Sequence, residues 1–279
     1  MRLGRVVKSF IGAAVLSMVA ATGVKAQVQQ ELSSSSVVEE IKKRGVMRVG
    51  MSVFVPWAMR SKEGELVGFE IDVARKLAQD MEVDIEFVPT AWAGIIPALL
   101  AKKFDVIVAG MSITPQRNMT VNFTTPYAHS GQQMTANKEL AGGFSLEDFN
   151  SSDVTITCRR GVAACDQVAG RLFPKATLRR FDDDAQAFQE VVNGSAHAVV
   201  SSAPKPRFWT MAHSDKLYMP TDENLSEGNE AIAVRKGDPD ALNFFSNWIQ
   251  EQKSSGWLQE RHDYWFKTQD WAGGVAAEQ

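Results

Sequence analysis

The sequence predicts an α/β fold built as two lobes, each with a mainly parallel sheet. Apolar residues at helical spacing alternate with short strand-like stretches in two successive series, from about residue 46 to 115 and from 154 to 200. Repeated strand–helix units of this kind are typical of parallel sheets. A glycine pair at 142–143 and a polar loop at 150–152 separate the two series. We therefore expect one lobe from each series.

The first series begins with a helix at residues 37–43. We then expect strands at 46–51, 83–87 and 106–109, and helices at about 71–81 and 95–101. Residues 106–109 are continuously apolar, which is typical of a parallel strand that is covered on both faces. Thr114 is a good cap for a helix whose first residue is Pro115.

The second series and the end of the chain follow the same alternation. We expect strands at 154–158, 177–181, 196–200 and 232–234, and helices at 163–173, 185–192, 239–253 and 257–266. The tail at 273–279 is small and polar, so we expect it to fray.

The first 26 residues have the pattern of a secretory signal peptide. Arg2, Arg5 and Lys8 precede an uncharged apolar run at 10–24, and a small residue, Ala26, precedes the expected cleavage point. The run of about 15 residues is shorter than the roughly 20 that span a bilayer. No cysteine lies near the cleavage point, so we expect a periplasmic protein without a lipid anchor.

Composition excludes several function classes. Cleavage removes four basic residues and no acidic one, which moves the formal net charge from -3 to -7 and argues against a nucleic-acid partner. Cys158 and Cys165 are the two cysteines, and the sequence leaves open whether they form a disulfide. The four histidines are scattered, and we expect no metal and no cofactor.

An ordered series of short motifs resembles the amino-acid-type bacterial extracellular solute-binding proteins, family 3. The series consists of FVPW at 54–57, GFEIDVA at 68–74, IPAL at 96–99, FDVIVAGMSITPQR at 104–117, PY at 126–127, NG at 193–194 and AIAVRK at 231–236. Each motif alone is weak, but their order and spacing cover nearly the whole chain after residue 26.

The resemblance implies a periplasmic binding protein-like type II fold, in which two hinge strands join the lobes. Lobe I would comprise residues 27–132 and 227–279, lobe II residues 133–226, and the hinges would lie near 131–137 and 219–228. The ligand would lie in the cleft, which closes about the hinges. The implied function is that of the periplasmic substrate-binding protein of an ABC importer, with an amino acid or related small carboxylate as ligand. The implied partner is the inner-membrane permease, and we expect a monomer.

The first-lobe residues after the buried strand form a candidate carboxylate receptor. Gly110 and Ser112 follow the strand, Thr114 begins the helix, and Arg117 supplies a planar fork for a carboxylate. Phe54 and Trp92 are candidate walls of the pocket. Trp57 either joins them or packs behind the cleft.

The second lobe departs from the family pattern at two places. Gly161, Val162 and Ala163 can offer only backbone N–H groups, because the usual hydroxyl side chains are missing. The usual acidic partner of the ligand ammonium aligns with Ser202.

Two explanations of the missing acid remain open, since a dry cleft penalises an unpaired ammonium. Either Glu230 or Asp183 replaces it, or the ligand lacks an α-ammonium group and is also held by Arg159, Arg160 or Lys205.

Two rival functions use the same scaffold. A periplasmic cyclohexadienyl dehydratase-like enzyme would need a general acid in the second lobe. The first carboxylate after Gly161 is Asp166, which we expect beyond the cleft edge, so we predict no enzyme. The other rival is a sensor protein that presents its ligand to a receptor.

Overall fold

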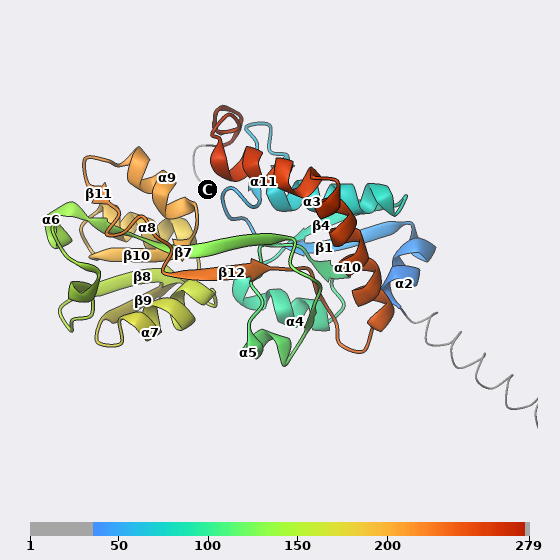
Figure 1. Cartoon of the computed structure of the whole chain (residues 1–279), viewed down its shortest axis with the longest axis horizontal. Coiled ribbons are helices and arrows are strands. Elements are labelled where there is room, and N and C mark those ends of the chain that lie inside the picture. Colours follow the sequence, from blue (N-terminus) through green and yellow to red (C-terminus); the bar gives the residue numbers. More distant parts are fainter. Residues whose placement is uncertain (1–35, 277–279) are drawn as a thin grey trace, which may run out of the picture.

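The structure, a computed structural model, describes residues 36–276, which form two α/β lobes joined by two strands (Figure 1). The predicted signal peptide at 1–26 lies outside the described residues. Among the described residues, no helix is both long enough and apolar enough to cross a membrane.

The sheet of the first lobe has the strand order β4-β1-β5-β13-β6. Strand β1 (Val46–Met51) pairs in parallel with β4 (Asp84–Pro89) and β5 (Val106–Ile107). Strand β13 (Ala233–Val234) pairs antiparallel with β5 and with β6 (Asn122–Phe123). A strand from near the chain end therefore completes the sheet that the N-terminal part begins.

Helices cover both faces of this sheet (Figure 1). One face carries α2 (Val37–Arg44), α3 (Phe69–Asp80), α10 (Pro239–Ser254) and α11 (Trp257–Lys267), and the other carries α4 (Ile95–Leu100) and α5 (Pro115–Asn118). Each face has its own apolar cluster, with Phe69 and Phe245 fully buried in one and Phe104 in the other. In the same lobe, the short strands β2 (Met59–Arg60) and β3 (Leu66–Val67) pair antiparallel as a separate hairpin.

The sheet of the second lobe has the strand order β11-β7-β10-β8-β9. Its strands are β7 (Ala128–Asn137), β8 (Thr155–Arg159), β9 (Thr177–Phe181), β10 (Ala198–Ser202) and β11 (Leu217–Tyr218). Strand β8 is parallel to β9 and β10, whereas β7 is antiparallel to β10. The helices are α6 (Lys138–Ala141), a π-helical turn (Ala164–Ala169), α7 (Gly170–Leu172), α8 (Asp184–Val192) and α9 (Lys205–Ala212).

The two connecting strands pair with each other. Strand β12 (Ser226–Glu230) runs antiparallel to β7, with Ser226 opposite Gln132 and Glu230 opposite Ala128. The same strand also bonds to the first lobe, because the Ile113 amide donates to the Asn229 carbonyl at 2.8 Å. The connection between the lobes is thus a two-stranded ribbon that is attached directly to residues 111–113.

The predicted helices and strands are found to within a few residues, but several short elements were not predicted: β2, β3, β6, β11 and α6. Three further differences stand out. The helix α9 was not predicted either; Pro206 lies in its first turn, where a proline removes no needed hydrogen bond. The predicted helix at 163–173 is a π-helical turn followed by α7.

The third difference is the C-terminal tail. The prediction that it frays is wrong for its described part, because Val275 bridges to Ser61 and the Lys62 amide donates to the Gly274 carbonyl at 3.0 Å. Trp271, which is 8% exposed, packs against the first-lobe core and holds the tail in place.

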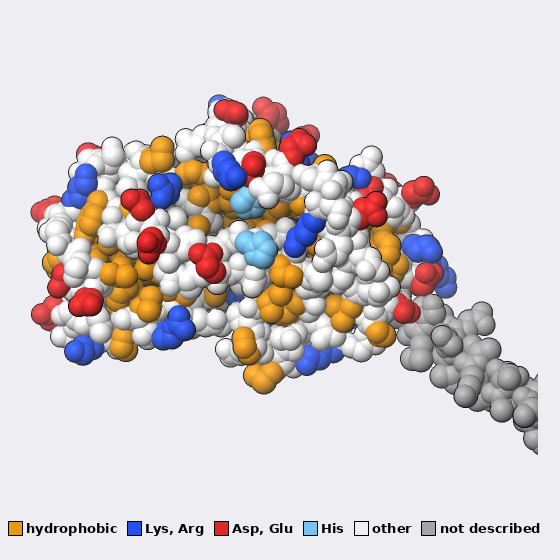
Figure 2. Space-filling view, viewed as in Figure 1, with side chains coloured by type: hydrophobic (Ala, Val, Ile, Leu, Met, Phe, Trp, Pro, Cys, Tyr) orange, Lys and Arg blue, Asp and Glu red, His pale blue; other side chains and the backbone are white. Residues whose placement is uncertain are grey.

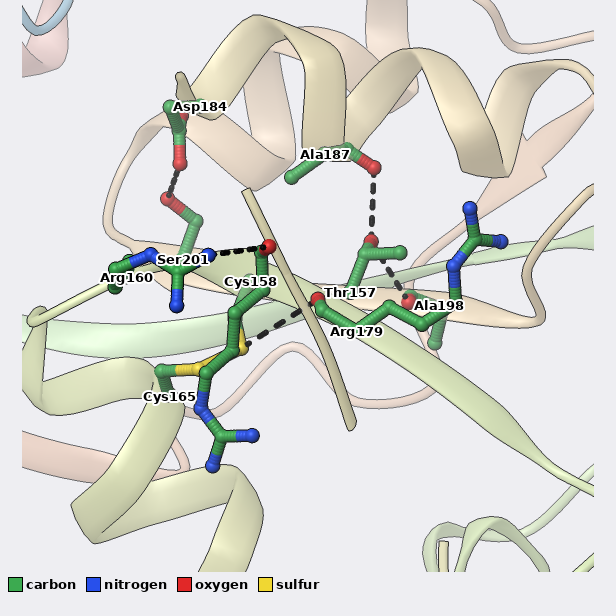
Figure 3. Close-up of a disulfide and its surroundings, with 10 residues drawn as sticks. Thr157, Cys158, Arg160, Cys165, Arg179, Asp184, Ala187, Ala198 and Ser201 are labelled. Carbon is green, nitrogen blue, oxygen red and sulfur yellow. Dashed lines mark hydrogen bonds between the residues drawn. A yellow bond between two sulfur atoms is a disulfide. The ribbon is translucent and has the colours of Figure 1, made fainter. Parts of the chain in front are cut away.

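Cys158 and Cys165 form a disulfide, the pairing that the sequence had left open (Figure 3). The bond joins the end of β8 to the helical segment that follows and encloses residues 159–164. These residues include the predicted site positions Gly161, Val162 and Ala163.

Removing this disulfide should destabilise the protein. Closing a short loop restricts the unfolded chain, and the loop-entropy relation gives about 2–3 kcal/mol for a loop of this size. We expect the Cys158→Ser/Cys165→Ser variant to unfold at a lower temperature by circular dichroism. Dithiothreitol should lower the unfolding temperature of the native protein and leave that of the variant unchanged; equal sensitivity of the two would contradict the prediction.

Candidate ligand site in the cleft between the lobes

A cavity lies between the two lobes, at the carboxyl ends of β5, β8 and β10. Its lining consists of Phe54, Trp57, Trp92, Ala109, Gly110, Ser112, Arg117, Gln132, Arg159, Val162, Ala163, Ser201 and Ser202. In open α/β sheets, ligands bind beyond the carboxyl ends of the strands. This cavity is therefore the candidate ligand site.

Arg117 is held in a fixed position by its own loop. The Thr114 hydroxyl accepts a hydrogen bond from the Arg117 amide at 3.2 Å and caps α5, which begins at Pro115 as predicted. The guanidinium donates to the Ser112 carbonyl at 2.8 Å and to the Gly161 carbonyl at 3.1 Å. Burial lowers the pKa of Arg117 to about 10, so the group remains cationic at neutral pH.

Gly110 is required beside this arginine. Its φ is +59°, and a Cβ atom there would lie 3.1 Å from the Trp57 ring. Trp57 itself is 3% exposed and packs edge-on against Phe69 and Phe266, so it lies mainly behind the cavity. Of the two alternatives for Trp57, packing behind the cleft therefore describes most of the ring.

Trp92 lies near two guanidinium groups. The Arg117 and Arg159 guanidinium carbons lie 5.5 and 5.9 Å from the centroid of its ring, within the range of cation–π interactions. The indole N–H donates to the Gly161 carbonyl across the cleft at 2.9 Å. That carbonyl thus accepts from both Trp92 and Arg117 of the first lobe.

Arg159 reaches the first lobe from the opposite side. Its Nη2 donates to the Ser52 hydroxyl at 2.7 Å, and its Nη1 lies 3.5 Å from the Val53 carbonyl. The residue is 7% exposed, and its Nε is buried without a hydrogen-bond partner. Ser202 at the end of β10 donates to the Gln132 side chain at 3.2 Å.

Most of the predicted site residues lie together in this cavity. Phe54, Trp92, Gly110, Ser112, Arg117, Val162, Ala163 and Ser202 line it. Thr114 and Gly161 do not; they line an adjacent cavity, because the Thr114 hydroxyl caps α5 and Gly161 presents its carbonyl to the first lobe.

Sequence reasoning missed Ala109, Gln132 and Ser201 as lining residues. Ala109 is adjacent to the predicted Gly110. Gln132 is placed by the register of β7, where it pairs with Ser202, and no local pattern indicates this pairing.

Neither acidic residue considered as a replacement lines the cavity. Asp183 caps α8 by accepting from the Ala185 amide at 2.7 Å, and Glu230 accepts from the hydroxyls of Ser112 at 3.2 Å and Ser130 at 2.8 Å. Asp184 lies behind Ser201, whose hydroxyl donates to it (Figure 3), and forms an ion pair with Lys205 at 3.0 Å. Arg160 pairs with Asp182 at 2.8 Å on the surface.

Two buried carboxyl groups have strongly raised pKa values. Burial raises the pKa of Glu70 to about 8, although the Tyr127 hydroxyl donates to it at 2.7 Å. Burial likewise raises the pKa of Glu230 to about 7. The folded protein therefore retains protons at near-neutral pH that the unfolded chain releases near pH 4.5.

These carboxyl groups predict that stability falls as the pH rises from about 5 to 8, because the folded state binds more protons in this window. Glu230→Gln should reduce the fall by about 1–3 kcal/mol, since an amide does not ionise. The measurement is urea unfolding at several pH values. Glu227→Gln, an exposed position on the same strand, is the control; a Glu230→Gln slope that matches this control would refute the prediction.

Comparisons with known proteins agree with this architecture. The family model for bacterial extracellular solute-binding proteins, family 3, matches residues 47–268. The L-cystine-binding protein TcyJ of Escherichia coli K12 is 26% identical over 274 residues, covering 95% of this chain and 96% of that protein. The cyclohexadienyl dehydratase of Pseudomonas aeruginosa is 25% identical, covering 91% of this chain and 92% of the enzyme.

A solved structure is similar over both lobes. The ancestral amino acid-binding protein AncCDT-1, described as a precursor of cyclohexadienyl dehydratase, has a TM-score of 0.76 and 39% identity, and the match covers 83% of this chain and all of that one. The predicted type II binding-protein fold is thereby confirmed. The chain belongs to the bacterial extracellular solute-binding proteins, family 3.

Proposed function

We propose that this protein is the periplasmic substrate-binding protein of an ABC importer and captures an amino acid or related small carboxylate in the cleft. The observation that carries the proposal is Arg117, a partly buried guanidinium that lines the cavity and is fixed by the Ser112 and Gly161 carbonyls. Such a fork binds a carboxylate with two parallel, charge-assisted hydrogen bonds. The relatives named for binding cystine and amino acids support the same class of ligand.

Closure of the lobes is the proposed mechanism of capture. The described arrangement already has contacts across the cleft, from Trp92 and Arg117 to Gly161 and from Arg159 to Ser52. A ligand that contacts both lobes stabilises the closed state by its differential affinity for that state. We propose that the lobes are residues 27–132 with 227–279, and 133–226, so that the paired strands β7 and β12 carry the rotation.

The proposed setting is the periplasm, which the predicted signal peptide and the family support. The proposed partner is the inner-membrane permease, which would receive the closed, loaded form of a monomeric protein. Figure 2 shows charged side chains of both signs spread over this face of the molecule, rather than the clustered basic surface that nucleic acids require.

Substitution of Arg117 tests the carboxylate receptor. Arg117→Lys keeps the charge but loses the planar fork, and we expect affinity for the ligand to fall by about 30-fold or more. The ligand is identified first by thermal-shift screening against amino acids and small carboxylates, and affinities are then measured by calorimetry. Arg160→Gln, a surface arginine outside the cavity, is the matched control.

Two outcomes would count against this function. Absence of stabilisation by every compound in the screen would contradict the proposal. Unchanged affinity in Arg117→Lys would return Arg117 to a structural role.

A binding role without turnover is part of the proposal, although one relative is a cyclohexadienyl dehydratase. Among the described residues, the cavity lining contains neither a carboxyl group nor an imidazole to act as a general acid. The side chain of Asp166, the carboxylate considered from the sequence, lies outside what the structure describes.

We therefore expect no conversion of prephenate or arogenate. The measurement is loss of either compound over hours at micromolar protein, followed by chromatography. The Pseudomonas aeruginosa dehydratase serves as the positive control, and conversion above the uncatalysed rate would establish an enzyme instead.

A further inference from the structure

The charged groups that line the cavity are all cationic. Arg117 and Arg159 face it from opposite lobes, and among the described residues no aspartate or glutamate lines it. Both guanidinium groups lie within 6 Å of the centroid of the same Trp92 ring, so the two cations share one part of the cleft.

Arg159 has hydrogen-bonding capacity that the protein does not use. It is 7% exposed, and its Nε has no partner, while its two terminal nitrogens donate to Ser52 and Val53. A buried donor without a partner is costly and is expected to meet an acceptor. An anionic group in the cavity would supply that acceptor.

The carboxylates near the cavity are already engaged. Asp184 is neutralised by Lys205 and accepts from Ser201, and Asp183 caps α8. Glu230 accepts from two hydroxyls behind Ser112, and burial raises its pKa to about 7. These carboxylates act on the two arginines from outside the cavity, and in the lining itself Arg117 and Arg159 leave an excess of positive charge.

The side chains at the end of β10 add no negative charge to the cavity. Ser201 and Ser202 both line it, and the Ser202 hydroxyl donates to Gln132. A primary ammonium closed into this cleft would have two guanidinium groups nearby and no carboxylate partner, and both conditions disfavour it.

We infer that the solute carries two anionic groups, one bound by Arg117 and the other by Arg159, and that it has no primary ammonium group. The inference rests on the proposed function, because it concerns the ligand of the same cleft. It assigns Arg159 a role in ligand selection, beyond its contacts with Ser52 and Val53 across the cleft.

The test compares three five-carbon acids by calorimetry: 2-oxoglutarate with two carboxylates, L-glutamate with an ammonium group in place of the keto oxygen, and 2-oxopentanoate with one carboxylate. Succinate, L-aspartate and butyrate form a second, four-carbon set. In at least one set, we expect the diacid to bind at least about ten times more tightly than the amino acid and the one-carboxylate acid of that set.

Two variants assign the preference to residues. Arg159→Gln should reduce the preference for the diacid over the one-carboxylate acid by about tenfold, because it removes only the second anion subsite. If Arg159 is merely a contact between the lobes, both affinities fall together and their ratio is unchanged. Ser202→Asp should shift the preference from the diacid toward its amino counterpart.

Arg160→Gln is again the control and should leave all ratios unchanged, and thermal unfolding without ligand confirms that each variant folds. An amino acid that binds as tightly as its diacid, or a ratio unaffected by Arg159→Gln, overturns the inference. Binding of other amino acids but of neither diacid also overturns it and leaves the proposed function intact. Absence of binding by every compound overturns both.

Discussion

The antiparallel pairing of β7 with β12 is the constraint on which the cleft depends. These strands are far apart in sequence, yet they form one ribbon that runs between the two sheets. Bonds from Met111 and Ile113 to the end of this ribbon attach the loop that precedes Arg117 directly to the hinge. The loop therefore keeps its position relative to the ribbon, and the rotation that we propose about the ribbon would move the second lobe relative to Arg117.

The Gly161 carbonyl is the second point on which the site depends. Gly161 has a φ of +76°, and its carbonyl accepts from both Trp92 and Arg117. The disulfide between Cys158 and Cys165 encloses this residue, which restricts the backbone that carries the carbonyl (Figure 3). The disulfide and the hydrogen bonds between the lobes thus both restrain the backbone around Gly161.

Two second-lobe side chains set the polarity of the cleft. Arg159 adds a cation, and Ser202, which aligns with the acidic position that the sequence resemblance implies, adds no charge. The fold is shared with the ancestral amino acid-binding protein AncCDT-1. Selectivity in such a scaffold resides in a few cleft residues, since the fold alone does not specify the ligand.

The sequence by itself determined the fold class, most helices and strands and the first-lobe loop from Gly110 to Arg117, because periodicity, caps and a local strand–loop–helix motif are local properties. The sequence also identified Ser202 as a departure from the pattern of the family that it resembles. Tertiary structure decided the disulfide, the roles of Thr114 and Gly161, and the inclusion of Gln132 and Ser201. It also placed Arg159 in the cavity and Arg160 on the surface, which depends on strand direction and lobe packing. The cavity lining joins residues distant in sequence, and no local pattern records such contacts. The two cysteines are only seven residues apart, but whether they bond depends on the geometry that the fold gives them.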